Sequence, residues 1–276
     1  MIELKIGNRE FDTKHHTYIM GILNVTPDSF SDGGKWNDYD AAMRHTEEML
    51  SSGCDILDIG GESTRPGHHQ ISEEEEIGRV APLIEAVKKN FDVPVSIDTY
   101  KSRVAGAAIQ AGADMVNDIW GFRYDKDMAP LVKQYDVSCC LMHNRNEAVY
   151  GNFIEDMNQD LKTCVETAKA AGIADDKIML DPGVGFGKTY EMNLDVMKHL
   201  DLFNNLGYPM LLGTSRKSMI GLTLDLPVTE REEGTLVTTV MAVQCGYGFV
   251  RVHDVEKNRR AIRMTEAILN LSLIHI

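Results

Sequence analysis

Eight short apolar segments recur along this chain, and each is followed by a longer segment in which apolar residues repeat with a helical period. The apolar segments predict strands at residues 18–23, 55–59, 93–97, 114–119, 137–142, 177–180, 209–213 and 248–252. The longer segments predict helices at about 39–52, 73–90, 101–111, 126–135, 155–172, 190–206, 230–246 and 254–271. Eight strand–helix units in 276 residues predict an α/β fold, the (β/α)8 TIM barrel. An open, doubly wound sheet is the alternative, because periodicity alone does not show that a sheet closes.

Local signals refine this assignment of elements. Ser72 precedes an expected helix and is a typical N-cap residue, and the acidic run Glu73–Glu76 is expected to form a solvated first turn. Residues 3–12 predict a small hairpin, which we expect to lie outside the main fold in an extension covering residues 1–17. The sequence contains no linker or low-complexity tract, so we expect residues 1–276 to form a single domain.

The composition restricts the classes of function that this chain can have. The formal net charge of −14 argues against general binding to nucleic acid or to a membrane surface. The five cysteines show no CxxC spacing, so we expect neither a structural zinc site nor a disulfide framework. The chain has no apolar run of membrane-spanning length and begins with no recognisable targeting signal, and we expect a cytoplasmic protein. In so acidic a chain, a local group of cations indicates a site for an anion.

Chemically active side chains follow all eight predicted strands. In a (β/α)8 barrel, the active site lies at the C-terminal ends of the strands. The residues at these ends are Asn24; Glu62, Thr64 and Arg65; Asp98; Asn117 and Asp118; His143, Asn144 and Arg145; Asp181; Lys217 and Ser218; and Arg251 and His253. Any one of them alone is better explained as a turn or capping residue. Eight such ends together indicate a functional site.

The first expected strand leads into an unusually long polar loop. After Asn24 the loop contains Asp28, Ser29, Ser31 and Asp32, whereas most connections between a strand and a helix are shorter. Large aromatic side chains in such a loop, here Phe30 and Trp36, usually cover something. The length and composition of this loop predict a catalytic loop on a rigid scaffold.

Three strand-end residues, Asp98, Asn117 and Asp181, are expected to point into the mouth of the barrel. Carboxylate and amide groups can bind the edge of a planar heterocycle, because a carboxylate accepts two parallel N–H bonds. Metal ligation and structural capping are the alternatives. The absence of a matching histidine cluster argues against a zinc or iron site.

Four cations lie at or just after the ends of predicted strands and indicate an anionic ligand. Arg65, Arg251 and His253 predict a site for a phosphate ester or pyrophosphate. Lys217 follows the seventh strand, and Ser218 is expected to begin a short helix whose N–H groups could bind a carboxylate or phosphate. A Schiff-base lysine and an exposed basic pair are the alternatives for Lys217. The segment 181–189 contains Gly-Lys-Thr, but Pro182 replaces the first glycine of a P-loop, so we reject that motif.

Several motifs, in this order, resemble those of the dihydropteroate synthases, which are pterin-binding barrels of the folate pathway. The matching segments are GILNVTPDSFSDGG, DIGGESTRPG, VSIDT, VNDIWG, LMHNR, LDPGVGFGK, LGTSRKS and VRVHDV. The resemblance implies a transferase that joins 6-hydroxymethyl-7,8-dihydropterin pyrophosphate to 4-aminobenzoate, giving 7,8-dihydropteroate and pyrophosphate. It also implies assistance by Mg²⁺, a homodimer and a target of sulfonamides. We take the helices around strands seven and eight as the dimer interface.

The resemblance assigns a role to each matching site residue. It implies a pterin pocket of Asp98, Asn117, Met142, Asp181, Phe186, Lys217 and Arg251. It implies that pyrophosphate is held by Asn24 (through Mg²⁺), Arg65, Arg251 and His253. It implies an aminobenzoate site of Phe30, Thr64, Pro66, Phe186, Lys217 and Ser218. Asp32 is expected to order the first loop and to stabilise a cationic pterin, and the catalytic set is Asp32, Asp98, Asp181, Lys217 and Arg251.

Two other functions are compatible with a pterin-binding barrel. A methyltetrahydrofolate-dependent corrinoid methyltransferase would share the Asp and Asn pattern, but it does not explain the DSFSDGG loop or Thr64-Arg65-Pro66. A catalytically inactive pterin-binding or regulatory protein would be expected to lack Asp181, Lys217 or Arg251, and all three are present. The synthase is therefore the prediction.

Overall fold

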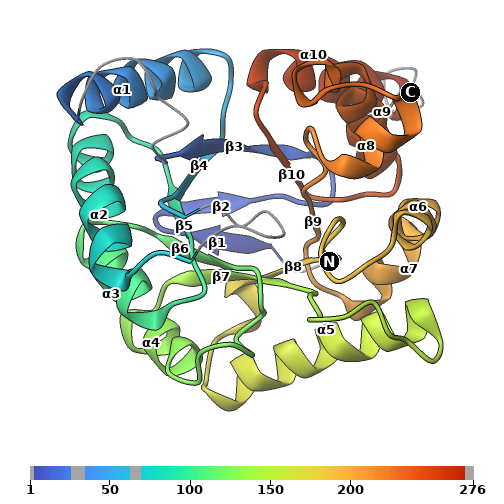
Figure 1. The fold of residues 1–276 in the computed structure, drawn as a ribbon, viewed down its shortest axis with the longest axis horizontal. Coiled ribbons are helices and arrows are strands. Elements are labelled where there is room, and N and C mark those ends of the chain that lie inside the picture. The colour runs from blue at the N-terminus through green and yellow to red at the C-terminus, as the bar shows by residue number, and fades with distance from the viewer. Residues whose placement is uncertain (1–2, 26–34, 63–69, 271–276) are drawn as a thin grey trace.

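The computed structural model describes residues 3–25, 35–62 and 70–270 of the chain. In this part of the chain, eight parallel strands form a central sheet and helices surround it (Figure 1). The strands are β3 (Tyr18–Asn24), β4 (Ile56–Gly60), β5 (Val95–Asp98), β6 (Met115–Asp118), β7 (Ser138–Met142), β8 (Ile178–Asp181), β9 (Leu211–Leu212) and β10 (Phe249–Val252). Their order around the sheet is β8-β7-β6-β5-β4-β3-β10-β9.

The two ends of this sheet meet. Leu180 of β8 forms a parallel bridge with Met210, and its N–H donates to the carbonyl of Pro209 at 3.0 Å. This closure confirms the predicted barrel over the open doubly wound sheet. The carboxyl ends of all eight strands consequently lie around one mouth.

Ten α-helices cover the barrel in the described part of the chain. They are α1 (Lys35–Ser51), α2 (Glu73–Asn90), α3 (Ser102–Gln110), α4 (Met128–Tyr135), α5 (Phe153–Ala170), α6 (Tyr190–Lys198), α7 (Leu200–Phe203), α8 (Ser218–Leu224), α9 (Glu232–Gln244) and α10 (Val255–Leu269). Three short 3₁₀ turns accompany them, η2 (Asp175–Lys177), η3 (Asn204–Leu206) and η4 (Val228–Glu230). The single helix expected at 190–206 is wrong, because His199 leaves the helical conformation (φ −120°, ψ 30°) and divides it into α6, α7 and η3.

The N-terminal hairpin does not lie outside the main fold as expected. It consists of β1 (Leu4–Ile6) and β2 (Arg9–Phe11), which pair antiparallel, and it lies at the centre of the ring of helices in Figure 1. Leu4, Ile6 and Phe11 are buried against the apolar residues that face inward near the start of the strands. These residues are Met20, Ile56, Met115, Cys140, Met179, Leu211 and Phe249. The hairpin thus closes the N-terminal end of the barrel, opposite the mouth, by burying apolar area.

The helix that begins after Ser72 confirms one expectation and corrects another. The Ser72 hydroxyl accepts the N–H of Glu75 at 3.1 Å, so Ser72 is the predicted N-cap of α2. Glu76 is not solvated, because it is 1% exposed and lies 2.8 Å from the ammonium group of Lys101. The acidic run therefore contributes three outer carboxylates to the first turn and one carboxylate to a buried ion pair.

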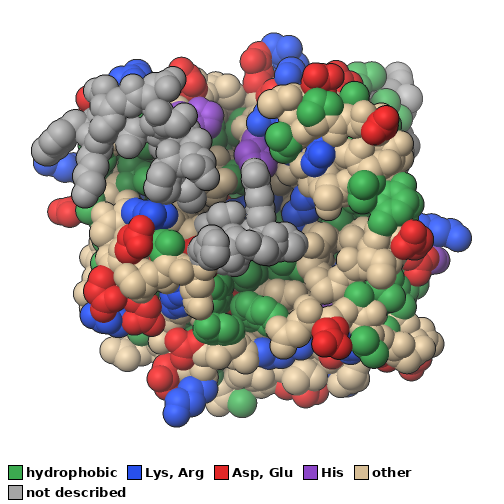
Figure 2. Space-filling view, in the orientation of Figure 1, with side chains coloured by type: hydrophobic (Ala, Val, Ile, Leu, Met, Phe, Trp, Pro, Cys, Tyr) green, Lys and Arg blue, Asp and Glu red, His purple; other side chains and the backbone are tan. Residues whose placement is uncertain are grey.

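The charged surface and the helix lengths agree with the charge content of the sequence and with its lack of long apolar runs. Acidic and basic side chains are interspersed around the rim of the face shown in Figure 2. Among the helices of residues 3–25, 35–62 and 70–270, none has both the length and the apolar character needed to cross a bilayer.

Candidate functional site

A layer of polar side chains lies directly above the apolar floor of the barrel. Side chains alternate between the two faces of a strand, so each residue two positions beyond a floor residue also points inward. Ile56 is followed in this way by Asp58, Met115 by Asn117, Met179 by Asp181, and Phe249 by Arg251. By the same alternation Asp98 and Met142 face inward from β5 and β7. The prediction that Asp98, Asn117 and Asp181 point into the barrel is confirmed.

Arg251 is held between two buried carboxylates. Its Nε donates to Asp58 Oδ2 at 2.5 Å, and its Nη2 donates to Asp98 Oδ2 at 2.7 Å. Burial alone would lower the pKa of Arg251, but Asp58 and Asp98 outweigh that effect and raise it. Asn117 Nδ2 donates to the same oxygen of Asp58 at 3.2 Å.

Asp58 was missed by the sequence reasoning, although a signal for it was present. It is fully buried, and it links Arg251 with Asn117. It is the one charged residue in the strand sequence ILDIG, whose other members are apolar or glycine. A carboxylate inside an otherwise apolar strand indicates an inward-facing partner for a cation.

The polar layer leaves several hydrogen-bond acceptors directed into the barrel. Within the described residues, Asp98 Oδ1 and Asp58 Oδ1 are buried without a hydrogen-bond partner. Because Asn117 donates its NH₂ group to Asp58, its amide oxygen is left to accept. Burial raises the pKa of Asp98 to about 7, and the negative charge of Asp58 adds to this effect while Arg251 opposes it. Burial also raises the pKa of Asp181, although Lys217 opposes it. Such a group of acceptors fits a ligand edge that carries several N–H donors.

Asp181, Lys217 and Arg251 converge around Gly213, at the end of β9. A Cβ added to Gly213 would lie 3.5 Å from Asp181 Oδ2 and 3.9 Å from both Arg251 Cβ and Lys217 Nζ. Lys217 Nζ donates to the carbonyl of Val184 at 2.5 Å and lies 4.6 Å from the centre of the Phe186 ring. Burial lowers the pKa of Lys217 to about 8, while Asp181 acts in the opposite direction.

An apolar wall adjoins these polar groups. Met142 packs with Tyr100 and Ile119, and the partly buried Trp120 and Phe186 pack against this cluster. The predicted neighbours Met142 and Phe186 are thus brought together, and Ile119 joins them as a residue that the sequence reasoning did not select. A flat ring placed over the polar layer would have this wall beside it.

Asn24, His253 and Ser218 lie at the ends of their elements. Asn24 ends β3, and His253 follows β10, which pairs with β3, so these two residues belong to neighbouring strand ends. Ser215 holds His253 from two sides, because its hydroxyl lies 2.8 Å from His253 Nδ1 and accepts the His253 N–H at 3.2 Å. Ser218 is the exposed first residue of the short helix α8, which confirms the expected helix start.

Not every predicted strand-end residue faces the mouth. Asp118 accepts the backbone N–H groups of Trp120 and Phe122, so it shapes the turn after β6. Glu62 accepts hydrogen bonds from Tyr100 at 2.6 Å and from Lys101 at 2.5 Å. The predicted residues Phe30, Asp32, Thr64, Arg65 and Pro66 lie outside the described residues.

Comparison with known proteins gives the family. The pterin-binding enzyme family model matches residues 20–253. The dihydropteroate synthase of Clostridium beijerinckii is 60% identical over 267 residues, which cover 96% of this chain and 99% of that protein. The dihydropteroate synthase of Bacillus subtilis is 51% identical over 262 residues, which cover 95% of this chain and 92% of that protein.

Solved structures of the same enzyme agree. The Clostridium difficile dihydropteroate synthase, crystallised in the presence of pteroic acid, superposes with a TM-score of 0.92 at 50% identity and covers 94% of this chain and 98% of its own. The Yersinia pestis enzyme in a sulfonamide drug complex superposes with a TM-score of 0.91 at 39% identity and covers 98% of this chain and all of its own. Together with the polar barrel mouth, these similarities show that the chain belongs to the dihydropteroate synthases, within the pterin-binding enzyme family.

Proposed function

We propose that the inward-facing polar layer binds the dihydropterin ring and that the surrounding rim binds pyrophosphate and 4-aminobenzoate. The chain is a transferase of folate biosynthesis by its family, so the proposal concerns which residues perform each part of the reaction. The observation that carries it is the group of acceptors from Asp98, Asn117 and Asp181 in one buried layer. A pterin presents an amino group and ring N–H groups along one edge, and these donors match such acceptors.

The rest of the pterin pocket follows from the groups around that layer. Lys217 is a donor that lies near Asp181 at the end of β9, and it suits the ring oxygen and nitrogen atoms. Arg251 is fixed by Asp58 and Asp98, so its planar guanidinium can stack on the ring. Met142 and Phe186 supply apolar contact to the ring.

Pyrophosphate binding is assigned to the neighbouring ends of β3 and β10. Asn24 and His253 lie on those ends, and Arg251 adds a cation below them. Arg65 is assigned to the same group by family resemblance, and it lies outside the described residues.

Mg²⁺ fits this site as a companion of the pyrophosphate. The amide oxygen of Asn24 is a hard oxygen ligand of the kind that Mg²⁺ takes together with phosphate oxygens and water. The described residues contain no group of three or more His, Cys, Asp or Glu arranged to hold a metal ion, so the substrate would have to provide further ligands. When bound, Mg²⁺ would neutralise charge on the departing pyrophosphate.

The 4-aminobenzoate site is assigned to the side of the mouth that carries Lys217. The Lys217 ammonium lies over the Phe186 ring, and this pair suits a ligand with a carboxylate and an aromatic ring. Ser218, at the start of α8, lies next in the chain. Phe30, Thr64 and Pro66 are assigned to this site by resemblance and lie outside the described residues.

We infer a dissociative, SN1-like step. Departure of pyrophosphate leaves positive charge on the pterin methylene, and the carboxylates of Asp98 and Asp181 lie where they can stabilise that charge. The aromatic amine is neutral at pH 7 and attacks without a strong base. Asp32, in the first loop, is assigned to help order that loop and to stabilise the cation, since water would otherwise trap it.

We further propose a homodimer formed through α8, α9 and α10. These helices lie together at the upper right of Figure 1, and they carry four apolar side chains that are at least 60% exposed. These are Leu222, Val237, Met264 and Ile268. An apolar surface of this kind is typical of an interface. A monomer mass in sedimentation equilibrium at micromolar concentration would contradict the dimer.

Three further assignments belong to this proposal. All five cysteines lie in the described part of the chain and are unpaired, which supports a reducing, cytoplasmic location. The hairpin packs into the barrel floor, which supports one domain for the whole chain. The Yersinia pestis relative forms a complex with a sulfonamide drug, and we expect the same class of inhibitor to compete with 4-aminobenzoate here.

The test combines turnover with removal of one side chain. Purified protein with dihydropterin pyrophosphate, 4-aminobenzoate and Mg²⁺ should produce dihydropteroate and pyrophosphate in equal amounts, and omission of Mg²⁺ should abolish both. Lys217→Ala should reduce kcat/KM about 100-fold or more, because it removes contacts to both substrates. Near-normal activity of this variant would contradict the site assignment.

A further inference from the structure

A buried lysine lies directly behind the Gly-rich turn that follows β8. Lys188 Nζ donates to the carbonyl of Gly183 at 2.8 Å and to that of Phe186 at 2.9 Å. It also lies 2.9 Å from Nδ1 of His143, so the ammonium group has three acceptors for its three N–H bonds. Burial lowers the pKa of Lys188 to about 7, while Asp181 opposes that effect. A cation in such a place is costly unless its hydrogen bonds are satisfied, and here they are.

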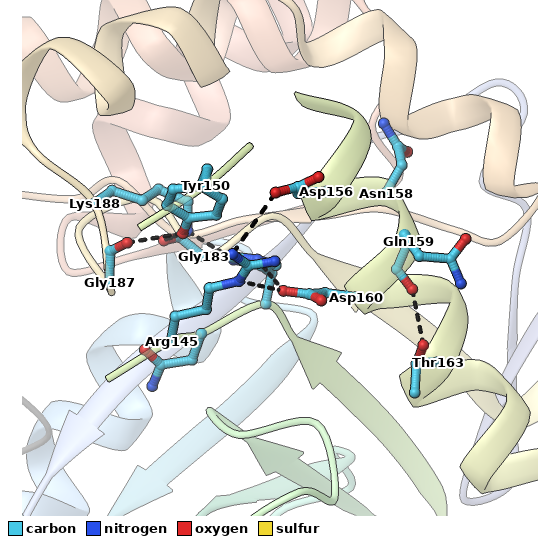
Figure 3. A network of polar contacts seen from close by, with 12 residues as sticks. Arg145, Tyr150, Asp156, Asn158, Gln159, Asp160, Thr163, Gly183, Gly187 and Lys188 are labelled. Atoms are coloured by element: carbon cyan, nitrogen blue, oxygen red, sulfur yellow. Dashed lines mark hydrogen bonds and ion pairs between the residues drawn. The ribbon is translucent and has the colours of Figure 1, made fainter. Parts of the chain in front are cut away.

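His143 connects this lysine to helix α5. Its imidazole is fully buried, and Nε2 lies 3.1 Å from Asp160 Oδ2. Because the ammonium form of Lys188 can only donate, His143 Nδ1 accepts from it and Nε2 carries the proton toward Asp160. Arg145 Nε donates to the same carboxylate at 2.7 Å, as Figure 3 shows. Burial lowers the pKa of His143 to about 4, so the imidazole is neutral at pH 7 and suits this arrangement.

The Gly-rich turn, residues 183–187, packs closely against the segment that carries His143. Gly183 has φ of +67°, and a Cβ added to it would lie 1.9 Å from the carbonyl oxygen of His143. Gly187 has φ of +57°, and a Cβ there would lie 2.5 Å from the carbonyl oxygen of Arg145. Tyr150 donates its hydroxyl to the Gly187 carbonyl at 2.8 Å (Figure 3). The turn and the segment after β7 therefore form one tightly packed unit.

The opposite side of the same turn contacts the functional site. Asp181 Oδ1 accepts the N–H of Gly183 at 2.7 Å, and the carbonyl of Val184 accepts from Lys217. Phe186 presents its ring to Lys217. The conformation of residues 183–186 thus determines where the Lys217 ammonium and the Phe186 ring lie.

We propose that Lys188, held by His143 and Asp160, is a positioning residue that sets this turn so that Lys217 and Phe186 are correctly placed for 4-aminobenzoate. Lys188 contacts main-chain carbonyls on one side of the turn, and the substrate-facing groups lie on the other. The inference rests on the assignment of Lys217 and Phe186 to the aminobenzoate site under the proposed function.

The first test compares Lys188→Met with a matched control, Lys198→Met, which replaces an exposed lysine at the end of α6. Steady-state rates are measured with saturating dihydropterin pyrophosphate and Mg²⁺ and varied 4-aminobenzoate. Lys188→Met should raise KM for 4-aminobenzoate about 10-fold or more, the size expected when hydrogen bonds of a charged group are lost. Lys198→Met should leave KM unchanged. A merely structural role would reduce the folded, active fraction and hence kcat, with KM unaltered, and that result would overturn the proposal.

A second pair of variants, at His143, tests the same positioning role if Lys188→Met does not fold. His143→Asn keeps a short amide whose oxygen can take the place of Nδ1, whereas His143→Leu fills the space without an acceptor. KM for 4-aminobenzoate should rise severalfold more in His143→Leu than in His143→Asn, and equal KM values would overturn the proposal. Lys217→Ala is measured in parallel. If Lys217→Ala raises KM for 4-aminobenzoate and the Lys188 and His143 variants do not, only the positioning role is wrong. If Lys217→Ala leaves this KM unchanged, the assignment of Lys217 to the aminobenzoate site is wrong.

Discussion

Lys101 is the cation whose removal should damage the barrel most. Its ammonium is 5% exposed and contacts Glu62 Oε2 at 2.5 Å, Glu76 Oε2 at 2.8 Å and the carbonyl of Ile71 at 2.9 Å. Lys101→Met keeps most of the apolar stem of the side chain and removes the ammonium group that Glu62 and Glu76 share. Breaking a buried ion pair by removing one partner costs about 3–5 kcal/mol.

The loss of folding stability in Lys101→Met should increase as the pH rises. Burial raises the pKa of Glu76, and Lys101 opposes that rise, so the variant should have a still higher value. A carboxyl group with a raised pKa in the folded state destabilises the fold progressively as pH rises from the unfolded value, here 4.5, through the folded value. The stability difference between wild type and Lys101→Met should therefore be small near pH 4.5 and larger at pH 8.

Urea unfolding of the substrate-free protein at pH 5 and pH 8 measures this difference. Lys162→Met, which replaces an exposed lysine on α5, is the matched control and should cost less than about 0.5 kcal/mol. Adding Glu76→Gln to Lys101→Met should recover part of the loss, because one uncompensated charge disappears. A loss at pH 8 below about 1 kcal/mol, or an equal loss at both pH values, would refute the reasoning.

Two predictions concern the pterin pocket. Asp181→Ala should weaken pterin binding by about 2–3 kcal/mol, because a buried charged acceptor is lost, and unchanged affinity in calorimetry would argue against its role. Asp58→Asn should weaken pterin binding about five- to tenfold, because Arg251 then has one carboxylate in place of two and Asn117 loses a charged acceptor. Equal pterin affinities of wild type and Asp58→Asn would show that Asp58 is not needed to orient these groups.

Much of the architecture could be predicted from the sequence because strands and helices alternate with distinct periods. The expectation that strand ends line one mouth correctly placed Asp98, Asn117 and Asp181 inside the barrel. Asp58 was missed because it lies between Leu57 and Ile59 inside an apolar strand, where an apolar side chain is the usual expectation.

Other features depend on contacts between distant segments, which no local pattern encodes. The acidic run at the start of α2 predicts a solvated first turn. In the structure Glu76 is buried instead, because it forms an ion pair with Lys101, 25 positions further along the chain. The pairing of Lys188 with His143 joins residues 45 positions apart. The hairpin was expected outside the fold because its two short strands do not indicate which distant apolar surface they cover.

The central claim is that the edge of the pterin ring is recognised by acceptors from Asp98, Asn117 and Asp181. A crystal structure of the enzyme with pteroic acid tests it most directly. We predict that the amino group and ring N–H groups of the pterin lie within hydrogen-bond distance of these three side chains, with the benzoate end toward Lys217 and Ser218. A pterin ring bound elsewhere, or bound in reverse with its amino edge directed away from Asp98, Asn117 and Asp181, would contradict the account.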